Sequence, residues 1–248
     1  MSELTRPFHV ELDAIGSDIV TLAAYSTEAV SRATQALLDG SLTEAQQVID
    51  QDDAIDAAAI AIEEECQRLL ALQQPMAGDL RKILSSLWIT TELERVGDLA
   101  SNICKGTRRL FGMQLIPRLR GQIAEMSEEA VRLTRLSVDA FIESDSGLAA
   151  ALDDIDDRLD ATHRAYVQSI FEAGIEVKLE TQPAVQLALI GRYYERIGDH
   201  AVNIGERVRY MVDGWTPEHA GAARERERKR LDVTRTEVQS LSQEDTVT

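Results

Sequence analysis

Residues 94–103 read Glu-Arg-Val-Gly-Asp-Leu-Ala-Ser-Asn-Ile, and residues 195–204 read Glu-Arg-Ile-Gly-Asp-His-Ala-Val-Asn-Ile. Seven of these ten positions are identical, at a constant offset of 101 residues. The same offset, applied without a gap, carries Asp52, Asp53 and Asp56 onto Asp153, Asp154 and Asp157. A shared register over such a distance favours duplication of one structural unit over chance, so the repeat guides the interpretation of the whole chain.

Long helical patterns fill both copies of the repeat. Small and apolar residues recur every three or four positions, and turn-forming residues separate the runs. We expect Asp79 to cap the third helix. The sequence therefore predicts an all-α fold of two tandem, sequence-related three-helix bundles. The six predicted helices cover residues 8–38, 42–73, 80–111, 123–142, 148–173 and 183–212.

The pattern divides the chain into three segments. Residues 1–112 form the first predicted three-helix bundle, residues 113–215 form the second, and residues 216–248 form a short polar tail. The tail has 6 basic and 7 acidic residues, few large apolar ones, and a charged run over residues 224–230. We expect the tail to be disordered or a frayed helix, with the charged run either solvated or making a contact.

The charge balance excludes several classes of protein. The formal net charge is −17, from 26 Lys and Arg against 43 Asp and Glu. Because phosphate backbones attract basic residues, this excess argues against nucleic-acid binding and fits cations or basic protein surfaces. Cys66 and Cys104 make no disulfide framework, which fits a reducing cytosol. No signal peptide is visible, and no uninterrupted apolar stretch approaches the ~18 residues of a membrane span.

The third helix of each copy carries two acids and an amide, each one turn apart, nearly opposite its apolar stripe. Like charges at this spacing destabilise a helix by a few tenths of a kcal/mol, so a surface without a ligand would gain from a Lys there. Hard cations prefer such oxygen ligands. The sequence thus predicts a metal site in each copy, the alternative being a solvated acidic face. The residues are Glu94, Asp98 and Asn102, and Glu195, Asp199 and Asn203.

Other groups have plainer explanations. Gly97 and Gly198 cost roughly 1 kcal/mol each in a helix interior, which close helix packing or close approach of a ligand would explain. We expect His163 to be a core histidine, and His200 is a weaker candidate ligand beside the second acidic pair. No Glu is followed three residues later by His, so a di-iron carboxylate bundle is not indicated.

These motifs, together with Gln74-Pro75-x-Ala77-x-Asp79-Leu80-Arg81, resemble the PhoU family of phosphate transport regulators. The resemblance extends over about residues 8–214. It implies a cytoplasmic all-α protein of two three-helix bundles, often dimeric. It also implies a negative regulator of the phosphate-starvation response, acting between the phosphate ABC transporter and a sensor histidine kinase.

The resemblance further implies surface clusters of divalent or trivalent metal ions, such as Fe, Zn, Mg or Mn. The fifth predicted helix is dense in aspartate, at positions 153, 154, 156, 157 and 160, which leaves open which pair acts. Lys105 stands in the first copy where the second has Glu206. The implied ligands are Asp52 or Asp53 with Asp56, Glu94, Asp98, Asn102, Asp153 or Asp154 with Asp157, Glu195, Asp199, Asn203 and Glu206.

The sequence and this resemblance together predict a non-enzymatic regulator of phosphate uptake and phosphate signalling. We expect a cytoplasmic homodimer, peripheral to the membrane at most, that docks on the transporter's ATPase subunit and on the sensor histidine kinase. One alternative is a metal-dependent enzyme acting on phosphoesters, for which the sequence indicates no general base. The other is a helical scaffold whose acidic residues only interact with solvent.

Overall fold

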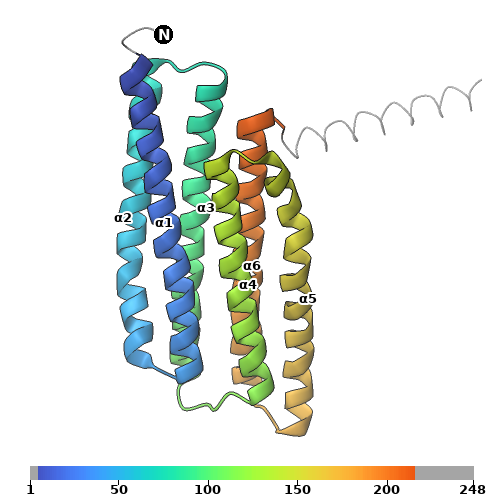
Figure 1. The fold of residues 1–248 in the computed structure, drawn as a ribbon. Coiled ribbons are helices and arrows are strands. Elements are labelled where there is room, and N and C mark those ends of the chain that lie inside the picture. The colour runs from blue at the N-terminus through green and yellow to red at the C-terminus, as the bar shows by residue number, and fades with distance from the viewer. Residues whose placement is uncertain (1–4, 216–248) are drawn as a thin grey trace, which may run out of the picture.

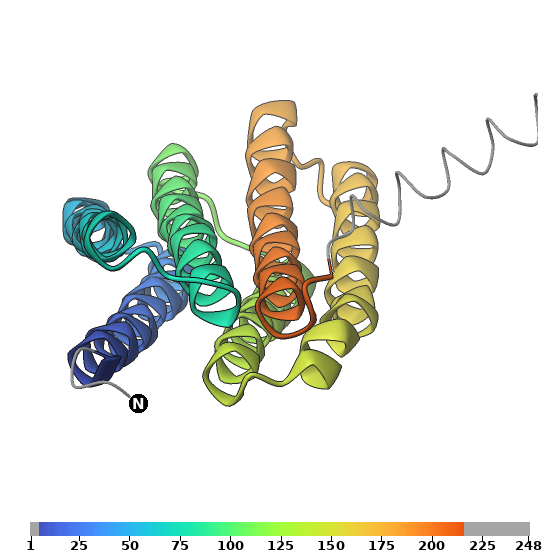
Figure 2. The same ribbon diagram turned by 90° about the horizontal axis from the view of Figure 1, so that it is seen from above.

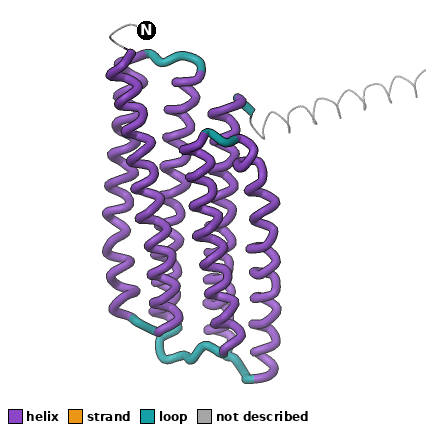
Figure 3. The backbone as a smooth tube through the Cα atoms, in the orientation of Figure 1, coloured by secondary structure: helices purple, strands orange, loops and turns teal. Residues whose placement is uncertain are grey.

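The computed structural model describes residues 5–215, and side chains from Phe8 onward. In this part of the chain the backbone forms six long α-helices and no strand (Figures 1 and 3). The predicted all-α fold of six long helices is thereby confirmed, whereas the predicted tail, residues 216–248, lies outside the described residues. The helices are α1 Thr5–Asp39, α2 Leu42–Gln73, α3 Gly78–Arg109, α4 Pro117–Glu143, α5 Ser146–Glu176 and α6 Thr181–Asp213.

The helices form two layers, seen end-on in Figure 2. One layer holds α2, α3, α6 and α5 in that order, and each helix packs against the next. The other layer holds α1 and α4, which pack against each other and against the first layer. Because α3 and α6 are the central pair, the two copies of the repeat meet along their third helices. None of the six described helices is long and apolar enough to cross a membrane.

The apolar stripes of the helices are buried in a core that both copies share. One cluster of buried side chains joins Val30 and Val96 of the first copy to Leu119 and Ile190 of the second. Another joins Ile19 to Phe141 in the same way. The division at residues 112 and 113 therefore remains a prediction about the repeat, because the hydrophobic core crosses it.

Polar residues cap two helices in equivalent places. Ser41 accepts a hydrogen bond from the backbone N–H of Glu44 at the start of α2, and Asp145 accepts from Gly147 and Leu148 at the start of α5. Each cap satisfies an N–H group that would otherwise lack a partner in the first helical turn.

The prediction that Asp79 caps the third helix is wrong. The chain turns at Ala77, whose φ of +51° is non-helical, and α3 begins directly afterwards at Gly78. Asp79 therefore lies inside the first turn, where its negative charge faces the positive end of the helix dipole.

The offset of 101 residues does not hold for the second helix of each copy. The buried positions of α2 recur in α5 at an offset of 104, while those of α3 recur in α6 at 101. The second repeat is thus three residues shorter where its second helix connects to its third. The matching buried pairs are Ala45 and Ala149, Val48 and Leu152, Ile55 and Leu159, Ile62 and Tyr166, Cys66 and Ile170, and Leu69 and Ala173.

Candidate metal centres

The first acidic cluster lies where α2 packs against α3. It consists of Asp52 and Asp56 from α2 and of Glu94 and Asp98 from α3, whose charges act on one another. Burial raises the pKa of Asp52 above its ordinary value, and the charges of Asp98 and Asp56 add to the increase. Burial also raises the pKa of Glu94, with further contributions from the other three carboxylates. The folded protein therefore holds four negative charges in proximity at a free-energy cost.

The second acidic cluster occupies the equivalent place between α5 and α6. It consists of Asp156, Asp160, Glu195 and Asp199. Burial raises the pKa of Asp156 to about 7, and the charges of Asp160 and Asp199 contribute to the shift. A buried side-chain oxygen of Asp156, Oδ1, has no hydrogen-bond partner among the described residues. This unpaired oxygen is a site at which a cation would replace a missing interaction.

The two helical glycines of the motif lie directly beneath these clusters. A Cβ atom on Gly97 would lie 3.0 Å from the Ile55 side chain and 3.7 Å from Asp52 Oδ1. A Cβ atom on Gly198 would collide with the carboxylate of Asp156 and lie 2.7 Å from Leu159 Cδ2. Of the two explanations that the sequence left open, close helix packing agrees with both contacts. In each copy the missing side chain lets a carboxylate of the neighbouring helix lie against the third helix.

One arginine spans each acidic pair of the third helices. Arg95 lies 3.5 Å from Glu94 Oε2 and 3.3 Å from Asp98 Oδ2. In the second cluster Arg192 contacts Glu195 and lies 3.6 Å from Asp199 Oδ2. Both arginine side chains are about half exposed. Burial and the three neighbouring carboxylates outweigh the effect of Arg95, which lowers the pKa of Glu94, and exposed ion pairs of this kind contribute little stability.

The structure brings some of the predicted ligands together and leaves others apart. Asp153 and Asp157 act electrostatically on Asp156, although both are exposed. Asp53 and Asp154 are also exposed, and neither contributes to the raised pKa values of the clusters.

The two amides and Glu206 lie outside this close grouping. Asn203 donates to Glu92 Oε2 at 3.2 Å, across the boundary between α3 and α6, and His200 Nδ1 lies 2.6 Å from the same oxygen. Burial of Glu92 raises its pKa, but the hydrogen bonds from His200 and Asn203 outweigh this and lower it. Asn102 is half-buried on α3, and Glu206 is half-buried further along α6.

Two residues of the second cluster, Asp156 and Asp160, were missing from the predicted ligands. At the offset of 104 they are the equivalents of Asp52 and Asp56. The signal that would have found them is the alignment of buried positions in α2 with those in α5, together with the matching caps Ser41 and Asp145. The offset of 101 residues relates the third helices only, because the connection between the second and third helices is three residues shorter in the second copy.

The donor types in both clusters suit a hard cation, because two helices contribute carboxylates to each cluster. As the side chains lie, no three His, Cys, Asp or Glu residues within residues 5–215 are gathered closely enough to hold an ion. Binding would therefore require the partly exposed carboxylates to rotate toward one another. The arrangement fits a metal in its residue types and placement and leaves the coordination geometry open.

The helices that carry these motifs match a known protein family and several of its members. The family model of the PhoU domain matches residues 19–107 and residues 123–208. A PhoU homolog 1 of Mycobacterium bovis, named a phosphate-specific transport system accessory protein, is 37% identical, covering 85% of this chain and 95% of the relative. A homolog of Pseudomonas aeruginosa with the same description is 31% identical, covering 90% of this chain and 93% of the relative.

Two solved structures share the fold. The crystal structure of PhoU from Pseudomonas aeruginosa superimposes with a TM-score of 0.78 at 31% identity, covering 84% of this chain and all of that one. The phosphate transport system regulatory protein PhoU from Streptococcus pneumoniae gives a TM-score of 0.77 at 28% identity, covering 84% and 98% of the two chains.

Proposed function

This chain belongs to the PhoU family, and from that membership we propose that it is a regulatory accessory protein of phosphate transport. The observation that carries the proposal is the family match in both repeats, over the helices that build both acidic clusters. Relatives whose names describe phosphate transport accessory proteins align along nearly their whole length.

Within this role we propose a cytoplasmic negative regulator of phosphate uptake and of phosphate-starvation signalling. It would couple the ATPase subunit of the phosphate ABC transporter to the sensor histidine kinase. A chain with a net charge of −17 and a shared helical core suits such docking, because complementary charge steers partners and fixes their orientation.

The acidic clusters would hold the metal ions of this regulator. Asp52, Asp56, Glu94 and Asp98 would bind in the first copy, and the second cluster would bind in the other. The raised pKa values and the unpaired oxygen of Asp156 support the proposal, because a cation would relieve both costs. A bound ion would then link α2 to α3 and α5 to α6.

The regulator would have no catalytic activity of its own. His200 lies beside the second cluster, but its Nδ1 contacts Glu92. The side-chain amide of Asn203 donates to the same carboxylate, so these two contacts are made to Glu92 and not to the cluster. A screen of phosphoester substrates with metal-loaded protein tests this: turnover abolished by cluster substitutions would instead establish the enzyme alternative.

A complementation experiment tests the regulatory role. The chain is expressed in its own host after deletion of the gene, and phosphate uptake and a phosphate-starvation reporter are followed in phosphate-replete medium. We expect the deletion to raise both and the wild-type chain to restore repression. Unchanged uptake and reporter activity in the deletion strain would refute the proposal.

Affinity capture tests the proposed partners and assembly. Wild-type protein from phosphate-replete cells should retain the transporter ATPase subunit and the sensor kinase, and light scattering should give the mass of a homodimer. Capture of neither partner would refute the coupling role, and a monomeric mass at micromolar concentration would refute the homodimer.

A further inference from the structure

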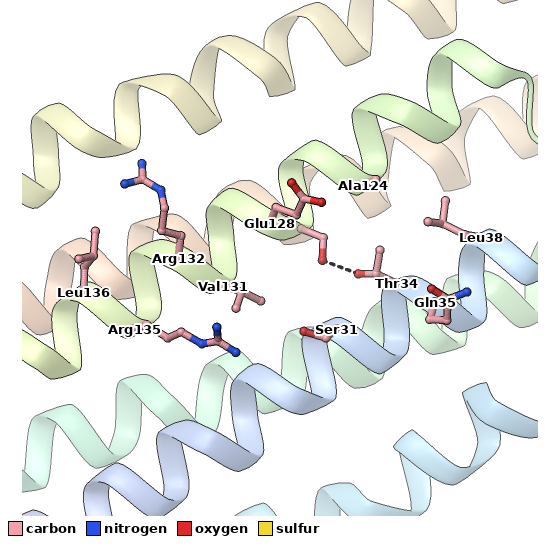
Figure 4. Close-up of a pocket in the computed structure, with 11 residues that line it drawn as sticks. Ser31, Thr34, Gln35, Leu38, Ala124, Glu128, Val131, Arg132, Arg135 and Leu136 are labelled. Carbon is pink, nitrogen blue, oxygen red and sulfur yellow. Dashed lines mark hydrogen bonds between the residues drawn. The ribbon is translucent and has the colours of Figure 1, made fainter.

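A pocket between α1 and α4 lies on the layer away from the acidic clusters and has no part in the proposed function. Figure 4 shows its lining residues along the groove where these two helices run side by side. Its volume of about 460 Å³ is within the range of small-molecule sites. Because α1 belongs to the first repeat and α4 to the second, the pocket spans both copies.

The floor of the pocket is a closed set of hydroxyl groups. Thr34 Oγ1 lies 2.8 Å from the carbonyl oxygen of Val30, 2.8 Å from Ser127 Oγ and 2.7 Å from the hydroxyl of Tyr194. A threonine hydroxyl has one hydrogen to donate and two lone pairs. Thr34 can donate this hydrogen to the Val30 carbonyl or to Ser127 Oγ, and either hydroxyl of the Thr34–Tyr194 pair can donate to the other, so these hydrogen bonds hold the floor in place.

Two other polar residues of the lining have acceptor capacity left for a ligand. Ser31 donates its hydroxyl hydrogen to the carbonyl oxygen of Thr27 at 3.0 Å, which leaves its lone pairs free. Gln35 donates its amide to Asp39, and its carbonyl oxygen has no partner among the described residues. Such acceptors suit a ligand that carries hydroxyl groups.

Arg135 supplies the positive charge of the pocket. It reaches from α4 toward Ser31 on α1 (Figure 4) and makes no ion pair or hydrogen bond within residues 5–215. Arg132, the other arginine of the lining, is bound to Glu129 at 2.7 and 2.9 Å. Glu128 adds one negative charge to the lining. Arg135 is exposed and has no such partner among the described residues, so its guanidinium group is available to an anionic ligand in the pocket.

We propose that this pocket binds a small hydroxylated organic oxyanion, of the size and chemistry of a sugar phosphate or a sugar acid. The guanidinium fork of Arg135 matches a phosphate or carboxylate group with paired hydrogen bonds. The free acceptors of Ser31 and Gln35 would receive the ligand's hydroxyl groups. Val131 and Leu136 give the carbon skeleton an apolar wall. The pocket is far larger than inorganic phosphate, which would leave this wall unused.

Isothermal titration calorimetry on the full chain tests the site. EDTA-treated protein is titrated with glucose 6-phosphate, gluconate and inorganic phosphate, so that no metal in the acidic clusters can bind the anion. We expect saturable binding of an organic anion, at least tenfold tighter than that of inorganic phosphate. The sugar phosphate and sugar acid arms show which anionic group is preferred, and tight binding of either supports the proposal.

Two substitutions locate the binding. Arg135→Gln should weaken it by about tenfold to a hundredfold, the expected effect of losing a charged hydrogen-bond donor. Arg164→Gln, a matched change at an exposed arginine of α5, should leave it unchanged. Ser31→Trp should block the pocket while the helix remains intact.

Three results would overturn the proposal. These are no saturable binding of either organic anion, equal affinity of wild type and Arg135→Gln, or equal affinity for inorganic phosphate and the organic anions.

Discussion

Gly97 and Gly198 hold equivalent places in the two motifs, but the neighbouring side chains lie closer to Gly198 than to Gly97. A methyl group on Gly198 would collide with the Asp156 carboxylate and the Leu159 side chain. Gly198→Ala would gain up to about 1 kcal/mol of helix propensity but lose about 1–3 kcal/mol through overpacking. With the full gain in helix propensity, we expect a net destabilisation of up to about 2 kcal/mol in chemical denaturation.

Gly97→Ala is the matched control for that substitution. Its closest contact is with the Ile55 side chain at 3.0 Å, which can shift slightly. We expect a change in unfolding free energy within about 0.5 kcal/mol of zero. Equal losses in the two variants would contradict this explanation of the motif glycines.

The raised pKa of Asp156 predicts a specific pH dependence in metal-free protein. Its pKa is about 7 in the folded chain against 3.8 for the unperturbed group, so folding favours the protonated form. The contribution of protonated Asp156 to the free energy of unfolding is fully present below about pH 4 and is lost as the pH rises through 7. Asp156→Asn should therefore exceed the wild type in stability at pH 8 by about 1–2 kcal/mol, after allowance for solvent screening, and match it near pH 4.

The control is Asp154→Asn, which removes an exposed carboxylate two residues away. It should change stability little at either pH in thermal melts with EDTA. If Asp156→Asn is no more stable than the wild type at pH 8, the ionised carboxylate of Asp156 does not destabilise the folded protein.

At the scale of single helices, the cap of α5 offers a clear test. Asp145 accepts two hydrogen bonds of 2.9 Å from the backbone of Gly147 and Leu148. Asp145→Ala should destabilise the protein by about 1 kcal/mol, while Asp145→Asn should retain most of the cap. A loss of the same size in both variants, measured by urea denaturation, would show that the side-chain cap is not the cause.

Most helix positions were predictable because their causes are local. The exception is α4, which begins at Pro117, six residues before the predicted start, because a proline suits the first turn of a helix. The bounds of α2 agree with the predicted range of 42–73, since Ser41 and the break at residues 74–77 are visible in the sequence. The start of α3 was less predictable, because the turn at Ala77 uses a positive φ that no glycine or asparagine signals.

The second acidic cluster was only partly predictable from the sequence. The acids of α3 and α6 could be aligned by their identical letters, but the partner helices could not. Asp156 is brought beside Asp199 by the three-residue difference between the connections, which the burial pattern of α5 and its cap Asp145 reveal. The contact of Asn203 with Glu92 likewise depends on how α3 packs against α6, which the repeat does not specify.

At the scale of the whole molecule, the two repeats should unfold together. Each buried cluster contains side chains from both copies, and the Thr34–Tyr194 hydrogen bond crosses from α1 to α6. Loss of either repeat would expose apolar surface of the other. Differential scanning calorimetry should therefore give one transition whose calorimetric and van't Hoff enthalpies agree. Two separate transitions would show that the repeats are independent units.

The number of metal ions bound per chain tests the central claim most directly, namely that both acidic clusters are the metal centres of this regulator. Native protein is measured by elemental analysis beside two double variants, Glu94→Gln with Asp98→Asn and Glu195→Gln with Asp199→Asn. We expect bound metal in the wild type, and loss of a separate share of it in each variant. Wild-type protein without stoichiometric metal, or two variants that keep the full complement, would contradict the account.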